Sequence, residues 1–160
     1  MENENDTLIN ERYYEAVSGL TEAILHDYER WYRYIIDLPR DLQVVYTIGI
    51  LNYQVLNGGL HQYFFNSYGQ FAYLTIDHLK RIKALKAASI LGRAIHEVNK
   101  DQYSVDEFRM RISERKLDRI VDFDEELADE LEKLTDEYYA LEGSEDDLLD
   151  QLGSYLAHFK

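Results

Sequence analysis

Apolar residues recur at steps of three and four through nearly the whole sequence, which is the spacing of an α-helix that buries one face. The pattern is most apolar over residues 40–56, which we predict to be the central core helix. The β-branched residues between 44 and 50 have no alternating partner segment elsewhere, so no sheet is expected. We therefore predict an all-α fold, a single compact bundle of seven to nine helices.

Turn and cap signals set the expected helix boundaries. Asp37-Leu38-Pro39 ends a helix, because the residue before a proline is steered away from helical dihedrals. Ser104 and Glu107 have the spacing of a capping box. The predicted helices cover about residues 7–18, 21–36, 40–56, 60–66, 70–80 and 83–99, then run from 105, from Asp122 or Asp124 to Gly143, and from Ser144 to Phe159. With one proline and no linker-like stretch, residues 1–160 are expected to form one domain.

The composition excludes several classes of protein. The 160 residues include 31 acidic and 17 basic side chains, and the formal net charge of −14 repels nucleic acids and anionic membranes. The absence of cysteine from the sequence excludes disulfides and cysteine-based metal sites. No apolar run reaches the roughly 18 residues of a membrane helix, and Met1 to Asp6 lack the features of a signal peptide. We expect a cytoplasmic protein that binds neither nucleic acid nor membrane directly.

The negative charge is concentrated near the C-terminal end. Residues 120–160 contain 14 acidic residues and two basic ones, Lys133 and Lys160. At helical spacing, two rows of carboxylates lie opposite a leucine face. The first row is Glu125, Asp129, Glu132 and Asp136, and the second is Glu126, Glu130 and Glu137. Like charges at such spacings cost about 0.2–0.5 kcal/mol per pair, whereas a routine solvated face mixes signs.

Two interpretations of the acidic face remain open. It can be a solubilising face, or one neutralised by the basic residues of the preceding helix, which are Arg109, Arg111, Arg115, Lys116 and Arg119. Alternatively, it binds a basic partner. A strand of duplex DNA presents about eight charges over about 27 Å, and a helix over residues 124–141 would be about as long and carries eight acids. The candidate partner-binding residues are Asp122, Glu125, Glu126, Asp129, Glu130, Glu132, Asp136, Glu137, Asp146 and Asp147.

A second, independent pattern lies between Gln54 and Gly69. The segment resembles the hallmark Glu-Val-x-Asn-Gly-Gly-Phe-x-Gln-Phe-Phe-x-Asn-Ser-x-Gly of a bacterial all-helical family of unknown function. The matching positions are Asn57, Gly58, Gly59, Gln62, Phe64 or Phe65, Asn66, Ser67 and Gly69. The sequence departs from the family at Gln54, usually Glu, at Leu60, usually aromatic, and at Lys83, usually a small residue.

The resemblance covers about residues 35–159, which leaves residues 7–34 as an N-terminal helical extension. It implies a compact helical bundle. The family includes an acidic DNA-mimic protein of Neisseria, a dimer that occupies the DNA-binding surface of a transcription factor. Acidic residues do not belong to the hallmark, so the resemblance implies the fold more directly than the mimic role.

The motif itself has an architectural and a functional interpretation. Gly58 and Gly59 permit a chain reversal, and Asn57 can cap the helix that ends there. Gln62, Asn66 and Ser67 can satisfy backbone groups at buried helix ends. Alternatively, the segment from Asn57 to Gly69 forms a pocket for a small ligand or peptide. That pocket would be lined by His61, Gln62, Asn66 and Ser67.

No catalytic centre, metal site or cofactor is predicted. None of the five histidines has a second histidine three or four residues away, and no phosphate-binding loop or nucleophile elbow is present in the sequence. The 14 tyrosines are mostly expected in the core or at its edge. The alternative is a homodimer or partner interface, for which the best candidate cluster is Trp31, Tyr32, Tyr34 and Ile35.

The sequence therefore predicts a non-enzymatic, acidic protein-binding module. Its expected partner is a basic protein such as a DNA-binding protein, with residues 122–150 acting as a DNA mimic. Two alternatives stay open: the ligand or peptide pocket at the motif, and a toxin-immunity type inhibitor that is acidic for the same electrostatic reason.

Overall fold

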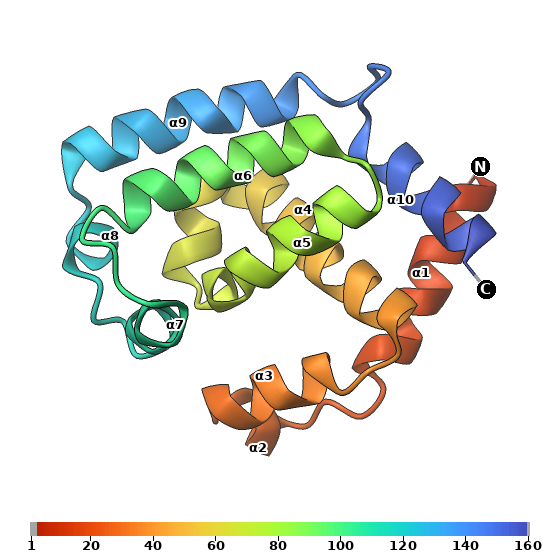
Figure 1. Ribbon diagram of the computed structural model, residues 1–160, viewed down its shortest axis with the longest axis horizontal. Coiled ribbons are helices and arrows are strands. Elements are labelled where there is room, and N and C mark those ends of the chain that lie inside the picture. The colour runs from red at the N-terminus through yellow and green to blue at the C-terminus, as the bar shows by residue number, and fades with distance from the viewer. Residues whose placement is uncertain (1–2, 160) are drawn as a thin grey trace.

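The computed structural model describes residues 3–159, and α-helices dominate it (Figure 1). The elements in chain order are α1 (Glu4–Val17), α2 (Glu22–Leu25), α3 (Tyr28–Ile36), α4 (Arg40–Phe65), the 3-10 helix η1 (Tyr68–Phe71), α5 (Ala72–Arg81), α6 (Leu85–Val98), α7 (Val105–Ser113), α8 (Asp118–Val121), α9 (Glu125–Tyr139) and α10 (Leu148–His158). No strand occurs within residues 3–159, and the predicted all-α fold is confirmed. Met1, Glu2 and Lys160, which belong to the predicted 1–160 domain, lie outside the described residues.

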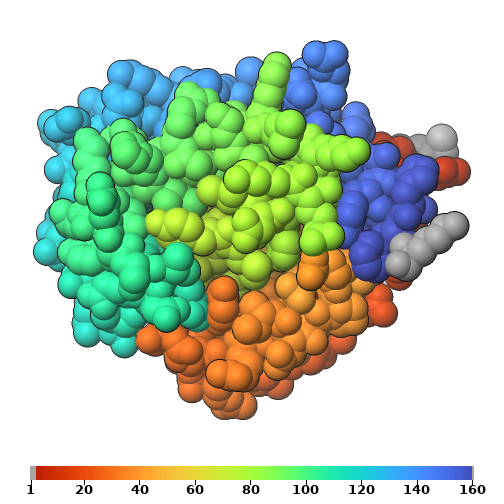
Figure 2. Space-filling view, in the orientation of Figure 1, coloured from red at the N-terminus to blue at the C-terminus, as the bar shows by residue number. Residues whose placement is uncertain are grey.

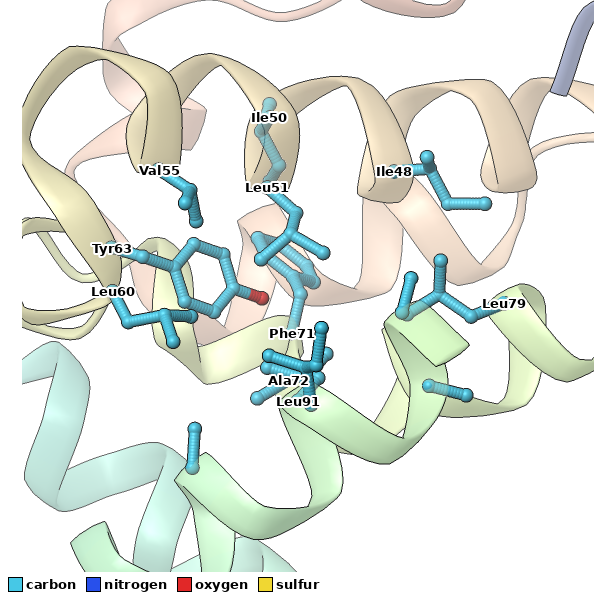
Figure 3. Packing of buried hydrophobic residues seen from close by; sticks show 14 of the residues in the cluster. Ile48, Ile50, Leu51, Val55, Leu60, Tyr63, Phe71, Ala72, Leu79 and Leu91 are labelled. Carbon is cyan, nitrogen blue, oxygen red and sulfur yellow. The ribbon is translucent and has the colours of Figure 1, made fainter. Parts of the chain in front are cut away.

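Helix α4 is the centre of the molecule, as its apolar sequence predicts. It contacts α1, α5, α9 and η1, and its side chains are buried on several faces. Figure 3 shows Leu51 and Val55 of α4 facing Tyr63, Phe71 and Leu91. An all-round apolar helix of this kind is stable only where neighbours cover it on several sides.

The N-terminal extension packs onto the rest of the chain through both of its longer helices. Helix α1 lies against α4 and α10, with Asn5 so close to Gly153 that a Cβ there would come within 2.4 Å of Asn5 Cγ. In α3, the Trp31 indole N–H donates to the Tyr46 hydroxyl at 2.9 Å. Trp31 is 7% exposed and Ile35 is fully buried. Trp31 and Ile35 therefore belong to the core and are not available to an interface, whereas Tyr32 and Tyr34 are half-buried, and the homodimer alternative stays a prediction.

Side-chain caps explain where the predicted boundaries were wrong. The expected helix over residues 21–36 is two helices, because the Asp27 carboxylate accepts from the Arg30 N–H and starts α3. Helix α9 ends at Tyr139 rather than Gly143. The last helix is capped by Asp147, not Ser144, since Asp147 Oδ1 accepts from the Asp150 N–H at 3.1 Å.

The capping box at Ser104 is half confirmed. The Ser104 hydroxyl accepts from the Glu107 N–H at 3.2 Å, as predicted. The Glu107 carboxylate instead binds the Arg111 side chain at 2.9 Å, one turn along α7.

Over residues 3–159, no helix is both long enough and apolar enough to cross a membrane.

Candidate functional site: the acidic face of α9

Helix α9 is fixed to the molecule by its apolar face. Asp124 caps its first turn by accepting from the Leu127 N–H at 2.9 Å. Leu127, Leu131 and Tyr138 are buried against the neighbouring helices. Figure 1 shows α9 along one edge of the molecule, beside α6, and it also contacts α4. The opposite face of α9, which carries the carboxylates, is left on the surface.

The Gly58-Gly59 turn positions α9. These two residues interrupt the helical dihedrals inside α4, and Gly59 has φ 82° and ψ 177°, a conformation that is essentially restricted to glycine. The predicted end of the core helix at these glycines is thereby confirmed, and the chain kinks there into a second helical segment. The turn directs the Leu60 N–H to the Thr135 hydroxyl of α9 at 3.0 Å. A Cβ on Gly59 would lie 3.3 Å from the same Thr135 oxygen, so the backbone and α9 are in close contact.

Two tyrosines of α9 add polar contacts to α4. The Tyr138 hydroxyl donates to Asn52 Oδ1 at 2.8 Å, and the Tyr139 hydroxyl donates to the Val55 carbonyl at 3.0 Å. Burial raises the pKa of Tyr138, so this hydroxyl stays protonated and remains a donor. Together with Thr135, these contacts set the rotation of α9 and hence the direction of its carboxylates.

Part of the acidic face is neutralised by the chain itself. Glu137 accepts two hydrogen bonds from Arg93 of α6, at 2.7 and 2.9 Å. This bidentate pair lowers the pKa of Glu137 and raises that of Arg93. Glu130 binds Lys133 at 3.2 Å within the same helix. We call Glu130 and Glu137 the paired carboxylates.

Two of the predicted partner-binding acids lie after α9 in the chain, and their carboxylates already have partners within the protein. Asp146 pairs with Lys86 at 3.0 Å. Asp147 Oδ2 accepts from the Gly143 N–H at 2.7 Å while its other oxygen caps α10. These side chains hold the turn between α9 and α10 in shape.

The first predicted row has no such partners. The carboxylates of its four members are exposed and make no hydrogen bond or ion pair with any residue between 3 and 159; the four are Glu125, Asp129, Glu132 and Asp136. We call them the free acidic row. Within the same part of the chain, Asp122 and Glu126 are also exposed and unpaired.

The basic residues that precede α9 do not neutralise this row. Arg109 stacks on Tyr32, with the guanidinium carbon 3.4 Å from the ring centroid. Arg111 and Lys116 pair with Glu107 and Glu114, respectively. Arg115 contacts the Phe65 ring, and Arg119 contacts the Asp124 carboxylate. The interpretation that this segment cancels the face is therefore wrong for the free acidic row.

A groove separates the free acidic row from the Gly-Gly turn. It has a volume of about 290 Å³, with Gly58, Gly59 and His61 on the turn and Glu132 and Asp136 on α9. Burial lowers the pKa of His61, which keeps the ring neutral near physiological pH. Part of the acidic face and part of the motif therefore line the same groove, although no sequence pattern predicted that these two regions would be neighbours.

An exposed aromatic ring stands at the start of α9. Phe123 is 59% exposed and stacks on His61 with ring centroids 4.2 Å apart. Its φ of 52° is an uncommon conformation for a bulky residue. Sequence reasoning missed Phe123, and it also missed Thr135 and Tyr139. The only available signal was a lone aromatic residue between two aspartates, which does not indicate exposure by itself.

The other motif residues form a packing unit rather than one pocket. Gln62 and Asn66 both donate to Gln54 Oε1 at 3.0 Å, so they satisfy a buried side chain rather than the helix-end backbone groups that were predicted. Gly69 packs against Phe64, where a Cβ would lie 2.6 Å from the ring. Asn57 is exposed, and its side chain caps no carbonyl among the described residues.

The four residues of the predicted motif pocket do not come together. His61 lines the groove beside α9, whereas Asn66 and Ser67 line a separate cavity next to α3 and α7. Gln62 lies over Gly58, with its Oε1 at the place that a Cβ of residue 58 would occupy. Within residues 3–159, no group of three or more His, Asp or Glu side chains is arranged to hold a metal ion.

The fold and this surface define a small, acidic, all-α protein with carboxylates held on a fixed helix. The chain belongs to the DMP19-like protein family, whose profile matches residues 36–158, from the end of α3 to the end of α10. The match agrees closely with the span expected from the motif, about residues 35–159. No curated protein and no solved structure matches the chain.

Proposed function

We propose that this chain is a non-enzymatic binding module whose free acidic row occupies the basic, DNA-binding surface of another protein. The observation that carries the proposal is that these four exposed carboxylates have no partner in residues 3–159, whereas Glu137 beside them binds Arg93. Keeping like charges unneutralised opposes folding, so the arrangement is best accounted for by an external partner.

The spacing of the charges supports DNA mimicry. Five unpaired carboxylates lie on α9 from Glu125 to Asp136: the free acidic row and Glu126. From residue 125 to residue 136 the helix rises about 17 Å. One strand of duplex DNA presents about five charges over that length. Membership of the DMP19-like family also supports the role, because the family it resembles includes an acidic DNA mimic.

The surroundings of the row supply what a protein interface needs besides charge. Phe123 offers an exposed ring at one end of the row, and aromatic anchors of this type often dominate interface energies. The long-range field of the row accelerates encounter with a basic partner, and salt screens this attraction. Binding should therefore be fast and sensitive to ionic strength.

The test is capture of binding proteins from a lysate of the source cells at low and high salt. The bait is the wild-type chain or a triple variant, Asp129→Lys, Glu132→Lys and Asp136→Lys. We expect the variant to lose capture while circular dichroism shows unchanged helicity. A matched control reverses three exposed acids away from α9, Glu11→Lys, Glu22→Lys and Asp101→Lys, with the same change in net charge.

The partner's relation to DNA decides between the mimic and its alternatives. Duplex DNA should compete with the wild-type chain for the captured protein. If the triple variant binds as well as wild type, the free acidic row is not the interface. If the partner has no affinity for DNA and is a toxic enzyme, the immunity-type alternative replaces the mimic.

A further inference from the structure

A cluster of basic side chains lies between the start of α4 and the end of α5, away from the acidic face. Arg40, Lys80 and Arg81 line a cavity there with a volume of about 640 Å³. Figure 2 shows the yellow-green surface of α5 meeting the orange surface of α3 and the start of α4. A cavity of this volume is large enough for a small organic ligand.

The three cations of this cavity have no ion-pair partner between residues 3 and 159. Asp77 also lines the cavity, but its carboxylate pairs with neither Lys80 nor Arg81 in the described structure. The cavity therefore holds three positive charges and one negative charge, in a sequence with 31 acidic and 17 basic residues. Because like charges repel, an anion from outside the chain would stabilise this arrangement.

His78 of α5 also lines the cavity, although only 4% of it is exposed. Its Nδ1 lies 2.6 Å from the Thr47 hydroxyl, which itself donates to the Gln43 carbonyl at 3.0 Å. Since a hydroxyl has a single proton, the Nδ1–H donates to Thr47, and Nε2 carries the lone pair of the neutral ring. Burial, with Arg40 and Arg81 nearby, lowers the pKa of His78 to about 4, so the ring is neutral at pH 7.

The second ring nitrogen, Nε2, is the part of His78 that a ligand can reach. It has no hydrogen-bond partner among residues 3–159. Unlike the Nε2 of His61 and the hydroxyl of Tyr155, which also have no partner in that part of the chain, it is not sealed off from solvent. A nearly buried side chain therefore presents an unpartnered acceptor to the cavity that the three cations line.

Gln43 of α4 supplies another acceptor on the same cavity. Its Nε2 donates to the carbonyls of Ile36 and Leu38, at 3.0 and 2.7 Å, and these two bonds fix the amide group. The Oε1 of Gln43 has no partner within the described chain. This oxygen is suited to accept a hydrogen bond from a hydroxyl group of a ligand.

The combination of cations with a neutral acceptor distinguishes one anion from another. A carboxylate or a sulfate carries no proton at pH 7, so the lone pair of Nε2 would repel its oxygens. A phosphate monoester has a second pKa of about 6, so it holds one proton at little cost. That P–OH group can donate to Nε2 while the other phosphate oxygens accept from the guanidinium groups of Arg40 and Arg81.

We propose that this cavity binds a phosphate group, free or as the monoester of a small molecule, whose P–OH donates to His78 Nε2 and whose other oxygens accept from Arg40 and Arg81. Below its second pKa the ligand brings this proton with it, and above that pKa the proton comes from the solvent. The site lies on α4 and α5 and uses no residue of the free acidic row, so it does not depend on the proposed mimic function.

Several charged or titratable groups around His78 influence this proton. They come from α4, α5 and α10, and they are Arg40, Asp77, Lys80, Arg81 and Tyr155. Burial raises the pKa of Tyr155 above its usual value, so its hydroxyl stays protonated near neutral pH. The proton that accompanies phosphate is therefore shared between the ligand and His78.

The test uses the full chain at constant ionic strength, without phosphate in the buffer, and four probes: inorganic phosphate, glycerol 3-phosphate, sulfate and acetate. In NMR titrations at pH 7 we expect a phosphate dissociation constant of about 1–10 mM, and values at least about tenfold higher for sulfate and acetate. The Nε2 signal of His78 should shift with phosphate. Tighter binding of glycerol 3-phosphate than of phosphate would assign the site to an organic monoester, and the reverse order would assign it to free phosphate.

Arg81→Gln tests the guanidinium contact. The variant should weaken phosphate binding at least about tenfold, because it removes a charged donor. Arg30→Gln is the matched control, since Arg30 is also exposed and has no ion pair in residues 3–159 but lies on α3, outside the cavity. It should bind phosphate as wild type does. Both arginines are exposed, so both variants should keep the melting temperature of the wild type.

The proton distinguishes this site from a simple basic surface. At about pH 8, where free phosphate is mostly a dianion, each bound phosphate should take up about one proton. Calorimetry in buffers of different ionisation enthalpy measures this uptake. In His78→Asn, which keeps a donor near Thr47 but lacks Nε2, the uptake should vanish together with the preference for phosphate over sulfate.

Any one of three results overturns the proposal. The first is the absence of NMR shifts with both phosphate and glycerol 3-phosphate. The second is phosphate binding that is as tight in Arg81→Gln as in Arg30→Gln. The third is phosphate binding without proton uptake at about pH 8, or sulfate binding as tight as phosphate binding at pH 7, since either would show that Nε2 of His78 does not contact the ligand.

Discussion

The free acidic row and the paired carboxylates lie on the same helix and have the same chemistry, but they differ in what lies across from them. Glu137 lies on the side of α9 where α6 supplies Arg93 at 2.7 Å. Glu132 and Asp136 lie on the other side, across a groove from the glycine turn, which carries no cation. For Glu137 the neighbouring helix therefore decides whether the charge remains available, whereas Glu130 is paired by Lys133 of its own helix.

Acidification gives the largest predicted effect on stability, and it acts through His78, a buried side chain of α5. Burial, with Arg40 and Arg81 nearby, lowers the pKa of His78 from 6.5 to about 4. Its Nδ1 lies 2.6 Å from the Thr47 hydroxyl. Between pH 6.5 and pH 4 the unfolded chain takes up a proton at His78 and the native chain does not, so the native state loses about 3 kcal/mol.

Urea denaturation at pH 7 and pH 4.5 measures this loss. His78→Asn, which keeps a donor near Thr47, should flatten the pH dependence of the unfolding free energy. Well above pH 6.5 the ring is neutral in both states, so the slope due to His78 vanishes there. A wild-type protein that is as stable at pH 4.5 as at pH 7 would contradict the assignment of this loss to His78.

Gly59→Ala tests whether the turn holds the free acidic row in place. The variant should lose about 1–3 kcal/mol, because a Cβ at φ 82° is strained and would press against Thr135. Gly143→Ala is the control: its φ is 74°, but nothing lies within 4 Å of the added atom. We expect a smaller loss there in thermal or urea unfolding. Equal losses would mean that contact with α9 contributes nothing.

The smallest effects compare the two sets of carboxylates directly. Glu132→Gln should raise the melting temperature slightly, because it removes repulsion, and Glu137→Gln should lower it, because it breaks the pair with Arg93. Both differences should shrink in high salt. An NMR titration should find the pKa of Glu137 below its usual value and restored in Arg93→Ala. Shifts of the same sign in the two glutamine variants would contradict the comparison.

The helices and the break at Gly58-Gly59 were predicted well from the sequence, because periodicity, glycines and caps are local signals. Asp124 starts α9 and Gly59 turns the chain as expected. The candidate site was predicted less completely. That Glu137 is paired depends on Arg93, 44 residues away along the chain. No local pattern carries that information.

The motif also contains contacts that local sequence patterns do not predict, here between residues of one short segment. Gln54, Gln62 and Asn66 all come from one segment of the chain, yet their mutual hydrogen bonds depend on how the chain folds back at the turn. Sequence reasoning assigned the two amides to backbone groups because helix ends usually need them. The cavity lined by Asn66 and Ser67 was equally hidden, since its walls come from three parts of the chain that are far apart in sequence.

The hydrogen bond from Leu60 to Thr135 means that the position of α9 depends on a main-chain N–H and a small inward-facing hydroxyl. None of the outward residues of the helix takes part in that attachment. The four side chains of the free acidic row can therefore be exchanged, one charge pattern for another, while the attachment of α9 stays the same. A scaffold of this type lends itself to redesign against new basic targets.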